Sequence, residues 1–112
     1  MQRVIEHSRA HKLGYISHRV GFDLSAVYLI YHPKTHEVIY IGETNSLYNR
    51  VNEHIKGIGR SSLRLKVRKR PELPQLILEY RIKYIAVDDY RERKFSEDIL
   101  LGIYRPMLNY TR

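Results

Sequence analysis

The chain has 112 residues, 43% of them hydrophobic, which suits a single domain with one core. Its net charge of +8 predicts a polyanionic partner, nucleic acid in the first place and an anionic membrane surface in the second. The absence of cysteine excludes disulfide scaffolds, thiolate zinc sites and cysteine nucleophiles.

No segment of the sequence predicts a leader peptide or a membrane anchor. The opening residues 1–7 contain no apolar run of signal-peptide length. The longest apolar stretch, residues 26–31, is far too short to cross a bilayer. We therefore expect a soluble cytoplasmic protein without a membrane partner, associated with the nucleoid if its source is bacterial or archaeal.

The first part of the chain is basic. We expect residues 1–25 to form an N-terminal extension that packs on or near a domain of residues 26–112. Val4, Leu13 and Ile16 give it only a loose helical periodicity. Its basic residues include His7, Arg9, His11, Lys12, His18 and Arg19. Three interpretations stay open: a helix that covers one side of the domain, an arm on a phosphate backbone, and a solvated helix.

Two strands and a turn follow, and together they predict a β-hairpin. Residues 26–31 are nearly all apolar, residues 32–37 are typical of a turn, and residues 38–42 give the second strand. Polar residues 43–46 offer helix caps, and residues 46–57 are predicted to form an amphipathic helix. The buried stripe of this helix recurs every four residues, at Leu47, Val51 and Ile55.

The segment 56–70 is strongly basic and contains no acidic residue. The cationic residues that we expect to bind nucleic acid there are Lys56, Arg60, Arg64, Lys66, Arg68, Lys69 and Arg70. Apolar and cationic residues alternate over 63–68, as in a strand. A helix would instead align Arg60, Arg64 and Arg68 in one row. In either conformation the cationic groups project together.

After a proline-rich break, a short helical turn at 75–79 and a third strand at 80–87 are predicted. Residues 90–104 predict a helix that ends at Arg105-Pro106. Because apolar residues nearly encircle this helix, we expect it to be buried. These residues are Phe95, Ile99, Leu100, Leu101 and Ile103.

Arg50 and His54 lie four residues apart, so they share one face of the helix predicted over 46–57. An arginine in such a position can donate two hydrogen bonds to a phosphate, and a histidine can exchange a proton near neutral pH. The competing interpretation is an ordinary solvated helix edge.

Four further polar residues stand on or beside predicted hydrophobic elements. Glu97 lies on a mostly apolar helix, where a buried carboxylate needs a partner, a proton or a metal ion; alternatively it is a first-turn acid that stabilises the helix dipole. Tyr28 and Tyr40 lie on adjacent strands, where tyrosines usually pack but two hydroxyls can also converge. Asn109 follows Pro106 and is either a plain turn residue or a hydrogen-bonding support.

The order and spacing of these residues resemble the active-site signature of the GIY-YIG nucleases. Tyr28 corresponds to the end of the first motif, and residues 40–42, Tyr-Ile-Gly, match the second motif in full. An arginine follows the second tyrosine by ten residues, and a histidine-or-tyrosine position follows four later. Glu97 and Asn109, twelve residues apart, resemble the closing segment of the family. The resemblance covers residues 26–110.

This resemblance implies an α/β (α+β layered) fold, in which a small three-stranded antiparallel sheet is flanked by helices. It favours a helix within residues 56–70. It implies a DNA endonuclease that hydrolyses phosphodiester bonds with one Mg²⁺ or Mn²⁺ ion per active site. The catalytic residues that it implies are Tyr28, Tyr40, Arg50, His54, Glu97 and Asn109.

The resemblance also implies individual roles. Glu97 would hold the metal ion and Arg50 would clamp the phosphate. A free phenol has a pKa of about 10, so a tyrosine base needs help from a cation or a neighbouring base. Tyr28 and His54 compete for the role of general base, and Tyr40 is also a candidate. The asparagine is implied to be structural or a hydrogen-bonding support.

Two positions depart from the family pattern. Ala26 replaces the glycine of the first motif, which adds one methyl group to a strand. Glu43 stands after the second motif, where several relatives carry a basic residue. If a cation at that place assists the phosphate, this chain needs another one, for which residues 60–70 are candidates.

DNA, most simply double-stranded DNA, is the expected partner. Since one active site cuts one strand, a double-strand break requires a homodimer, successive nicks or a separate specificity partner. Two other functions stay open. One is a non-catalytic nucleic-acid-binding module with the same fold, and the other is a nuclease for RNA or for branched DNA.

Overall fold

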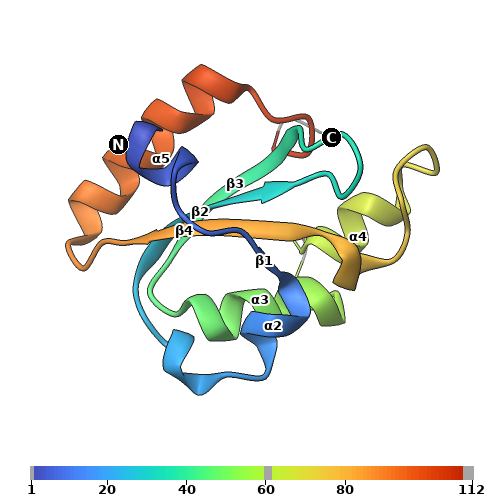
Figure 1. Cartoon of the computed structure of the whole chain (residues 1–112), viewed down its shortest axis with the longest axis horizontal. Helices are drawn as coiled ribbons and strands as arrows, with labels where there is room; N and C mark the ends of the chain where they lie inside the picture. The colour runs from blue at the N-terminus through green and yellow to red at the C-terminus, as the bar shows by residue number, and fades with distance from the viewer. Residues whose placement is uncertain (1, 60–61, 110–112) are drawn as a thin grey trace.

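The computed structural model describes residues 2–59 and 62–109 and forms a four-stranded antiparallel sheet with helices on both faces (Figure 1). The strands are β1 (His11–Lys12), β2 (Ala26–Tyr31), β3 (Val38–Thr44) and β4 (Arg81–Ala86), in the order β1-β4-β2-β3. The α-helices are α1 (Gln2–Glu6), α2 (Leu13–Ser17), α3 (Leu47–Lys56), α4 (Leu63–Arg68) and α5 (Tyr90–Tyr104), and the 3₁₀ turns are η1 (Val20–Phe22) and η2 (Ile77–Glu79). None of these helices is long and apolar enough to span a membrane.

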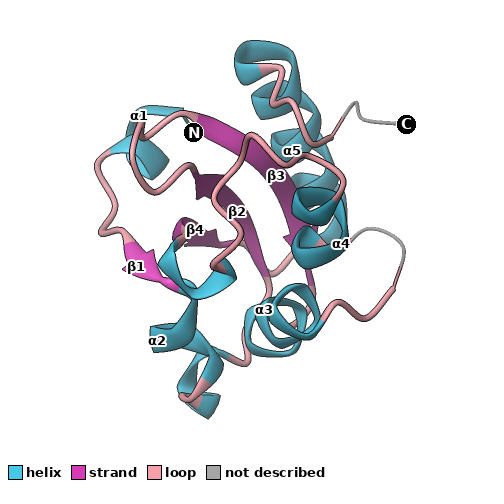
Figure 2. Cartoon of the chain, turned by 90° about the vertical axis from the view of Figure 1, so that its right-hand side faces the viewer, coloured by secondary structure: helices cyan, strands magenta, loops and turns pink. Residues whose placement is uncertain are grey.

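The sheet lies between two helical layers (Figures 1 and 2). Because successive residues of a strand point to opposite faces, β2 contributes to both layers. Tyr28 and Ile30 pack in the cluster that includes residues of α2, α3 and α4. Val27 and Leu29 pack with Ile5 of α1 and with α5 on the other face. Both faces of β2 are therefore covered, which explains why its residues 26–30 are all buried.

The fourth strand corrects the prediction of a three-stranded sheet. β1 is only two residues long and pairs with the edge of β4, His11 opposite Ile82 and Lys12 opposite Arg81. A two-residue strand leaves no alternation in the sequence, so periodicity could not reveal it. Leu13, directly after β1, is fully buried and anchors this part of the chain to the domain.

The other predicted elements are found with small shifts in their ends. The strand over 26–31 and the helix over 90–104 have the predicted bounds, and the second strand extends to Thr44. The ambiguous basic segment contains a helix over 63–68. The α+β layering implied by the resemblance is thus confirmed, with one strand more than expected.

The outer face of α5 contradicts the prediction that this helix is buried. Phe95 is 67% exposed, and Ile99 and Ile103, one and two turns later, are also exposed. Only one side of α5 contacts the sheet, through the buried Leu100 and its neighbour Leu101. A helix with apolar residues on every side is fully buried only where a further layer of structure covers its outer face. The helix α1, which packs on the same face of the sheet, has only five residues and is too short to form such a layer.

Candidate active site

Two tyrosines and a histidine from β2, β3 and α3 form one cluster. The ring centroids of Tyr28 and Tyr40 lie 6.2 Å apart, and His54 packs edge-on against them at 5.8 and 5.1 Å. The helix that carries the histidine is capped by Ser46, whose hydroxyl accepts a hydrogen bond from the backbone N–H of Asn49. The structure therefore brings together three residues that sequence reasoning singled out separately.

Gly42 explains how the first tyrosine reaches this place. It lies on β3 directly opposite Tyr28 on β2. A β-carbon at position 42 would lie 2.5 Å from Cζ of Tyr28, far inside van der Waals contact. The phenol therefore lies over the bare glycine backbone, and the glycine of the second motif is needed here for space.

The hydrogen bonds of His54 determine which ring nitrogen carries its proton. The backbone N–H of Leu63, at the start of α4, donates to Nδ1 at 2.8 Å, so the neutral ring is protonated on Nε2. That Nε2–H donates to the Tyr28 hydroxyl at 2.8 Å. Burial, followed by the charges of Arg50 and Lys66, lowers the pKa of His54 to about 3. The ring is therefore neutral at physiological pH, and its one free lone pair is already used.

Acid should destabilise the fold through this histidine. An unfolded histidine has a pKa of about 6.5. Below that pH the unfolded chain therefore binds a proton at His54 that the native protein does not bind. Stability should therefore fall as the pH drops toward the native pKa of about 3, by up to about 1.4 kcal/mol per pH unit from this residue.

Urea denaturation of the wild-type protein and of His54→Gln at pH 7, 6 and 5 checks this expectation. The glutamine variant lacks the titrating ring, so its stability disadvantage should shrink steadily as the pH falls. A difference in stability that stays constant over this range would contradict a neutral, buried His54.

Arg50 extends its guanidinium toward the second tyrosine. Its Nη2 lies 3.4 Å from the Tyr40 hydroxyl, and its Nη1 donates to Oε1 of Glu53 at 3.1 Å. Burial works to lower the pKa of Arg50, but Tyr28, Tyr40 and Glu53 raise it overall. The guanidinium is therefore a permanent positive charge, held on two sides, beside a tyrosine that keeps 7% of its surface exposed.

Glu97 lies on α5, in the opposite helical layer, and its charge acts on the cluster. Burial raises the pKa of Tyr28 well above its usual value, and the charge of Glu97 adds to that rise. The carboxylate is 15% exposed, and its Oε1 accepts a hydrogen bond from Nζ of Lys94 at 2.9 Å. The acid singled out in the sequence is thus partly buried and paired with a cation one turn earlier on its own helix.

The donor set fits a metal ion that keeps most of its water. Within residues 2–59 and 62–109 no three or more His, Cys, Asp or Glu side chains gather where they could hold an ion. Mg²⁺ often binds proteins through one or two carboxylates, with water and substrate phosphate as its other ligands. Glu97, with a partly exposed carboxylate whose charge acts on Tyr28, suits that kind of site.

Asn109 attaches the end of the described chain to the sheet. Its Oδ1 accepts a hydrogen bond from the Ile41 N–H, and its Nδ2 donates to the Ile41 carbonyl, both at 2.8 Å. The N–H of Leu108 donates to the carbonyl of Ile39 at 3.0 Å. β3 is the last strand of the described sheet, so these bonds satisfy part of its open edge. Asn109 thereby holds the strand that carries the second motif.

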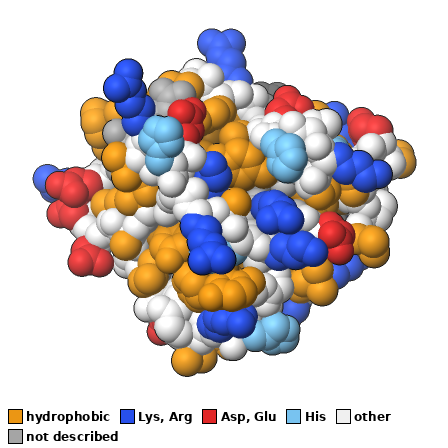
Figure 3. Space-filling model, in the orientation of Figure 1, with side chains coloured by type: hydrophobic (Ala, Val, Ile, Leu, Met, Phe, Trp, Pro, Cys, Tyr) orange, Lys and Arg blue, Asp and Glu red, His pale blue; other side chains and the backbone are white. Residues whose placement is uncertain are grey.

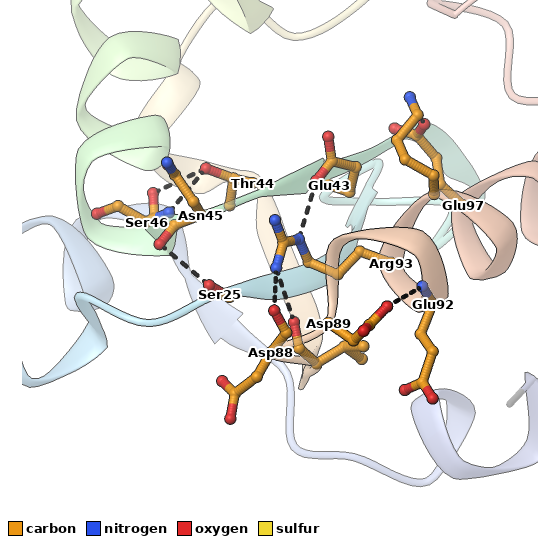
Figure 4. A network of polar contacts seen from close by, with 12 residues as sticks. Ser25, Glu43, Thr44, Asn45, Ser46, Asp88, Asp89, Glu92, Arg93 and Glu97 are labelled. Atoms are coloured by element: carbon orange, nitrogen blue, oxygen red, sulfur yellow. Dashed lines mark hydrogen bonds and ion pairs between the residues drawn. The ribbon is translucent and has the colours of Figure 1, made fainter.

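Sequence reasoning missed Arg93, which neutralises Glu43 (Figure 4). Nε of Arg93 donates to Oε2 of Glu43 at 3.0 Å, and their side chains are only 7% and 17% exposed. Nη1 of Arg93 donates to the carbonyls of Val87 and Asp88 at 3.1 and 2.8 Å. The pair ties α5 to the end of β3. The one available signal was Glu43 itself, an acid where several members of the family are expected to carry a basic residue.

Arg64 and Lys66, in the basic segment 56–70, donate hydrogen bonds to backbone carbonyls of the protein. Nε of Arg64 donates to the carbonyl of Ile55, which joins α4 to α3. Nζ of Lys66 donates to the carbonyl of Leu108 at 2.9 Å. Burial, followed by the charges of Lys69 and Arg50, lowers the pKa of Lys66, so its ammonium lies within the field of the site.

The comparisons with known proteins agree with this geometry. The family model of the GIY-YIG catalytic domain matches residues 24–97, from just before β2 to the acid on α5. The chain belongs to the GIY-YIG family. The match includes both tyrosine motifs and the α3 pair of arginine and histidine, and it ends before Asn109. No curated protein sequence matches this chain.

Solved structures show the same fold. Two tyrosine-to-phenylalanine mutants of the GIY-YIG N-terminal endonuclease domain of UvrC from Thermotoga maritima, each bound to its catalytic divalent cation, are 22% and 24% identical to this chain. Each comparison covers 80% of this chain and 86% of that domain, with a TM-score of 0.56. The magnesium-bound form of the same domain is 23% identical over 77% and 83% of the two chains, with a TM-score of 0.55.

Proposed function

We propose that this GIY-YIG chain is a divalent-metal-dependent endonuclease that hydrolyses phosphodiester bonds in DNA, nicking one strand at each active site. Hydrolysis of a phosphodiester needs a positioned nucleophile and positive charge at the phosphate. The observation that carries the proposal is the contact of Arg50 with the Tyr40 hydroxyl, inside a cluster on which the charge of Glu97 also acts.

In this proposal Tyr40 is the group that accepts the proton of the attacking water. Water must reach the base, and Tyr40 keeps 7% of its surface exposed whereas Tyr28 is fully buried. This role needs the phenolate, and Nη2 of Arg50, 3.4 Å from the Tyr40 oxygen, is a cation placed to pair with it. Tyr28, whose hydroxyl accepts a hydrogen bond from the Nε2–H of His54, stacks against the Tyr40 ring and helps to hold it in place. His54 is then a positioning residue.

In this proposal Arg50 binds the phosphate and Glu97 holds the metal ion. Arg50 is already oriented by Tyr40 and Glu53, so its guanidinium can donate to a phosphate with little loss of side-chain freedom. Glu97 would hold one Mg²⁺ or Mn²⁺ ion, which supplies Lewis-acid stabilisation of the phosphate when bound. The divalent cation bound in the Thermotoga maritima domain supports this class of ion.

Duplex DNA is the proposed substrate, because exposed cations lie on more than one part of the surface. In the basic segment these are Lys56, Arg68 and Lys69; Arg70 pairs with Glu72 at 3.8 Å, and Arg60 lies outside the described residues. Further Lys and Arg side chains gather over β1 and β4, on the face shown in Figure 3. Such contacts bind phosphates of any sequence.

Replacing Arg68 and Lys69 together with glutamine should flatten the salt dependence of DNA binding. Both side chains are exposed, so the fold should not change. Each lost phosphate contact reduces the slope of log K against log salt by about one, so the double variant should lose about two. Fluorescence anisotropy of a labelled duplex without metal measures the slope. An Arg3→Gln/Arg91→Gln variant, with the same change of charge elsewhere, should keep it.

Cleavage of supercoiled plasmid with EDTA, Mg²⁺ or Mn²⁺ tests the proposal itself. We expect open circles to accumulate before linear DNA, and only with a divalent ion present. Binding without cleavage under every condition would instead identify a nucleic-acid-binding module. Parallel assays on RNA and on branched duplexes identify the preferred substrate, and sedimentation shows whether the protein is a homodimer.

A further inference from the structure

We propose that Lys94 is the internal counter-ion of the metal site, which a divalent ion must displace from Glu97 in order to bind. This inference rests on the proposed nuclease function. It begins from the hydrogen bond of 2.9 Å between Nζ of Lys94 and Oε1 of Glu97. The two residues are three positions apart on α5, so the helix itself brings them together.

The ammonium of Lys94 interacts with two carboxylates. The hydrogen bond and the charge of Glu97 raise the pKa of Lys94 most, and the charge of Glu43 raises it further. Figure 4 shows the carboxylates of Glu43 and Glu97 turned to the same side of the site, one from β3 and the other from α5. The ammonium of Lys94 therefore lies beside the acid that the ion requires.

A count of charges shows why the lysine must leave. Glu43 and Glu97 carry two negative charges, which Arg93 and Lys94 balance. A divalent ion on Glu97 would add two positive charges next to an ammonium already in contact with that carboxylate. Like charges at such short range repel strongly where water is partly excluded.

Lys94 is the member of this group that can move. Its side chain is 43% exposed, so it can swing into water at small cost. Arg93 is 7% exposed and holds three hydrogen bonds, to Glu43 and to two backbone carbonyls. Metal binding therefore exchanges the Lys94–Glu97 ion pair for the ion, and the ion pair weakens metal affinity.

This arrangement would couple the ion to the substrate. In the absence of DNA, the ammonium competes with the ion for a single carboxylate. A bound phosphate adds negative charge at the same place, where it can contact both the ion and the displaced ammonium. Lys94 would thus also supply, from α5, the cation that Glu43 does not provide after the second motif.

Calorimetric titration of the metal-free protein with MnCl₂ tests the inference. We expect Lys94→Met, which keeps the length of the side chain but not its charge, to bind Mn²⁺ about three- to tenfold more tightly than the wild type. Lys94→Arg should stay within about twofold of the wild type, as should Arg91→Met, which removes an exposed charge one turn earlier. Glu97→Gln should show no binding at this site.

Equal or weaker Mn²⁺ binding by Lys94→Met, with unchanged circular dichroism and melting temperature, would overturn the inference and leave the nuclease proposal intact. A lack of Mn²⁺ binding in both the wild type and Lys94→Met would overturn the ion site and the inference together. If Lys94→Met binds Mn²⁺ more tightly but neither protein cuts any nucleic acid, the counter-ion role stands and the nuclease proposal fails.

Discussion

Replacing Glu97 with glutamine should reduce plasmid cleavage by at least about a thousandfold, because it removes the only carboxylate proposed to hold the ion. The amide keeps the size of the side chain but cannot supply the negative charge that Mg²⁺ requires. DNA affinity measured without metal should stay the same or rise slightly, because one negative charge is lost from the surface. Cleavage rate and anisotropy, measured on the same preparation, separate the two effects.

The fold of this variant should be preserved. The lost ion pair with Lys94 is partly exposed, and pairs of that kind contribute about 0.2–1 kcal/mol. Glu92→Gln is a matched control, since it changes an exposed acid on the same helix and should cut at the wild-type rate. Residual cleavage by Glu97→Gln above a tenth of the wild-type rate would show that another group holds the ion.

The parts of the fold that the sequence predicts are those with a long, regular pattern. The 15-residue helix α5 is bounded by Asp89, whose carboxylate caps it, and by the Arg105-Pro106 break, so both ends were found. The strand over 26–31 is a continuous apolar run bounded by polar residues. The exposure of Phe95, by contrast, depends on which elements lie above α5, and no pattern within the helix carries that information.

In the candidate site, too, features set by local spacing could be predicted, and features set by tertiary contacts could not. Side chains with a fixed spacing, such as Arg50 and His54, could be assigned to one helix face. Their partners could not be predicted where the partner is a backbone group, as with the Leu63 N–H on His54 and the Ile41 amide on Asn109. Every residue except proline has a backbone N–H, so the sequence does not show which of them bonds to His54. Only the tertiary structure shows that the Leu63 N–H occupies the lone pair on which His54 would accept a proton.

Replacing Gly42 with alanine should disrupt the site more than any other single methyl group added to the sheet. The new β-carbon would lie 2.5 Å from Cζ and 2.9 Å from Cε1 of Tyr28. The phenol cannot move aside, because Tyr28 is fully buried between Tyr40 and His54. We expect a loss of about 1–3 kcal/mol in unfolding free energy, the usual cost of overpacking a core.

Activity should fall even where this variant is folded, because the displaced ring breaks the 2.8 Å contact between the Tyr28 hydroxyl and His54 and pushes on Tyr40. A misplacement of about 1 Å in a catalytic group commonly costs about a hundredfold in rate, so kcat should drop by that order under conditions where the variant is folded. Gly102→Ala on α5 is the control: a β-carbon there meets nothing within 4 Å, and it should leave kcat unchanged and stabilise the helix slightly. A Gly42→Ala protein with wild-type kcat would mean that the Tyr28 ring can leave its place without consequence, and that neither the phenol nor its contact with His54 contributes to the reaction.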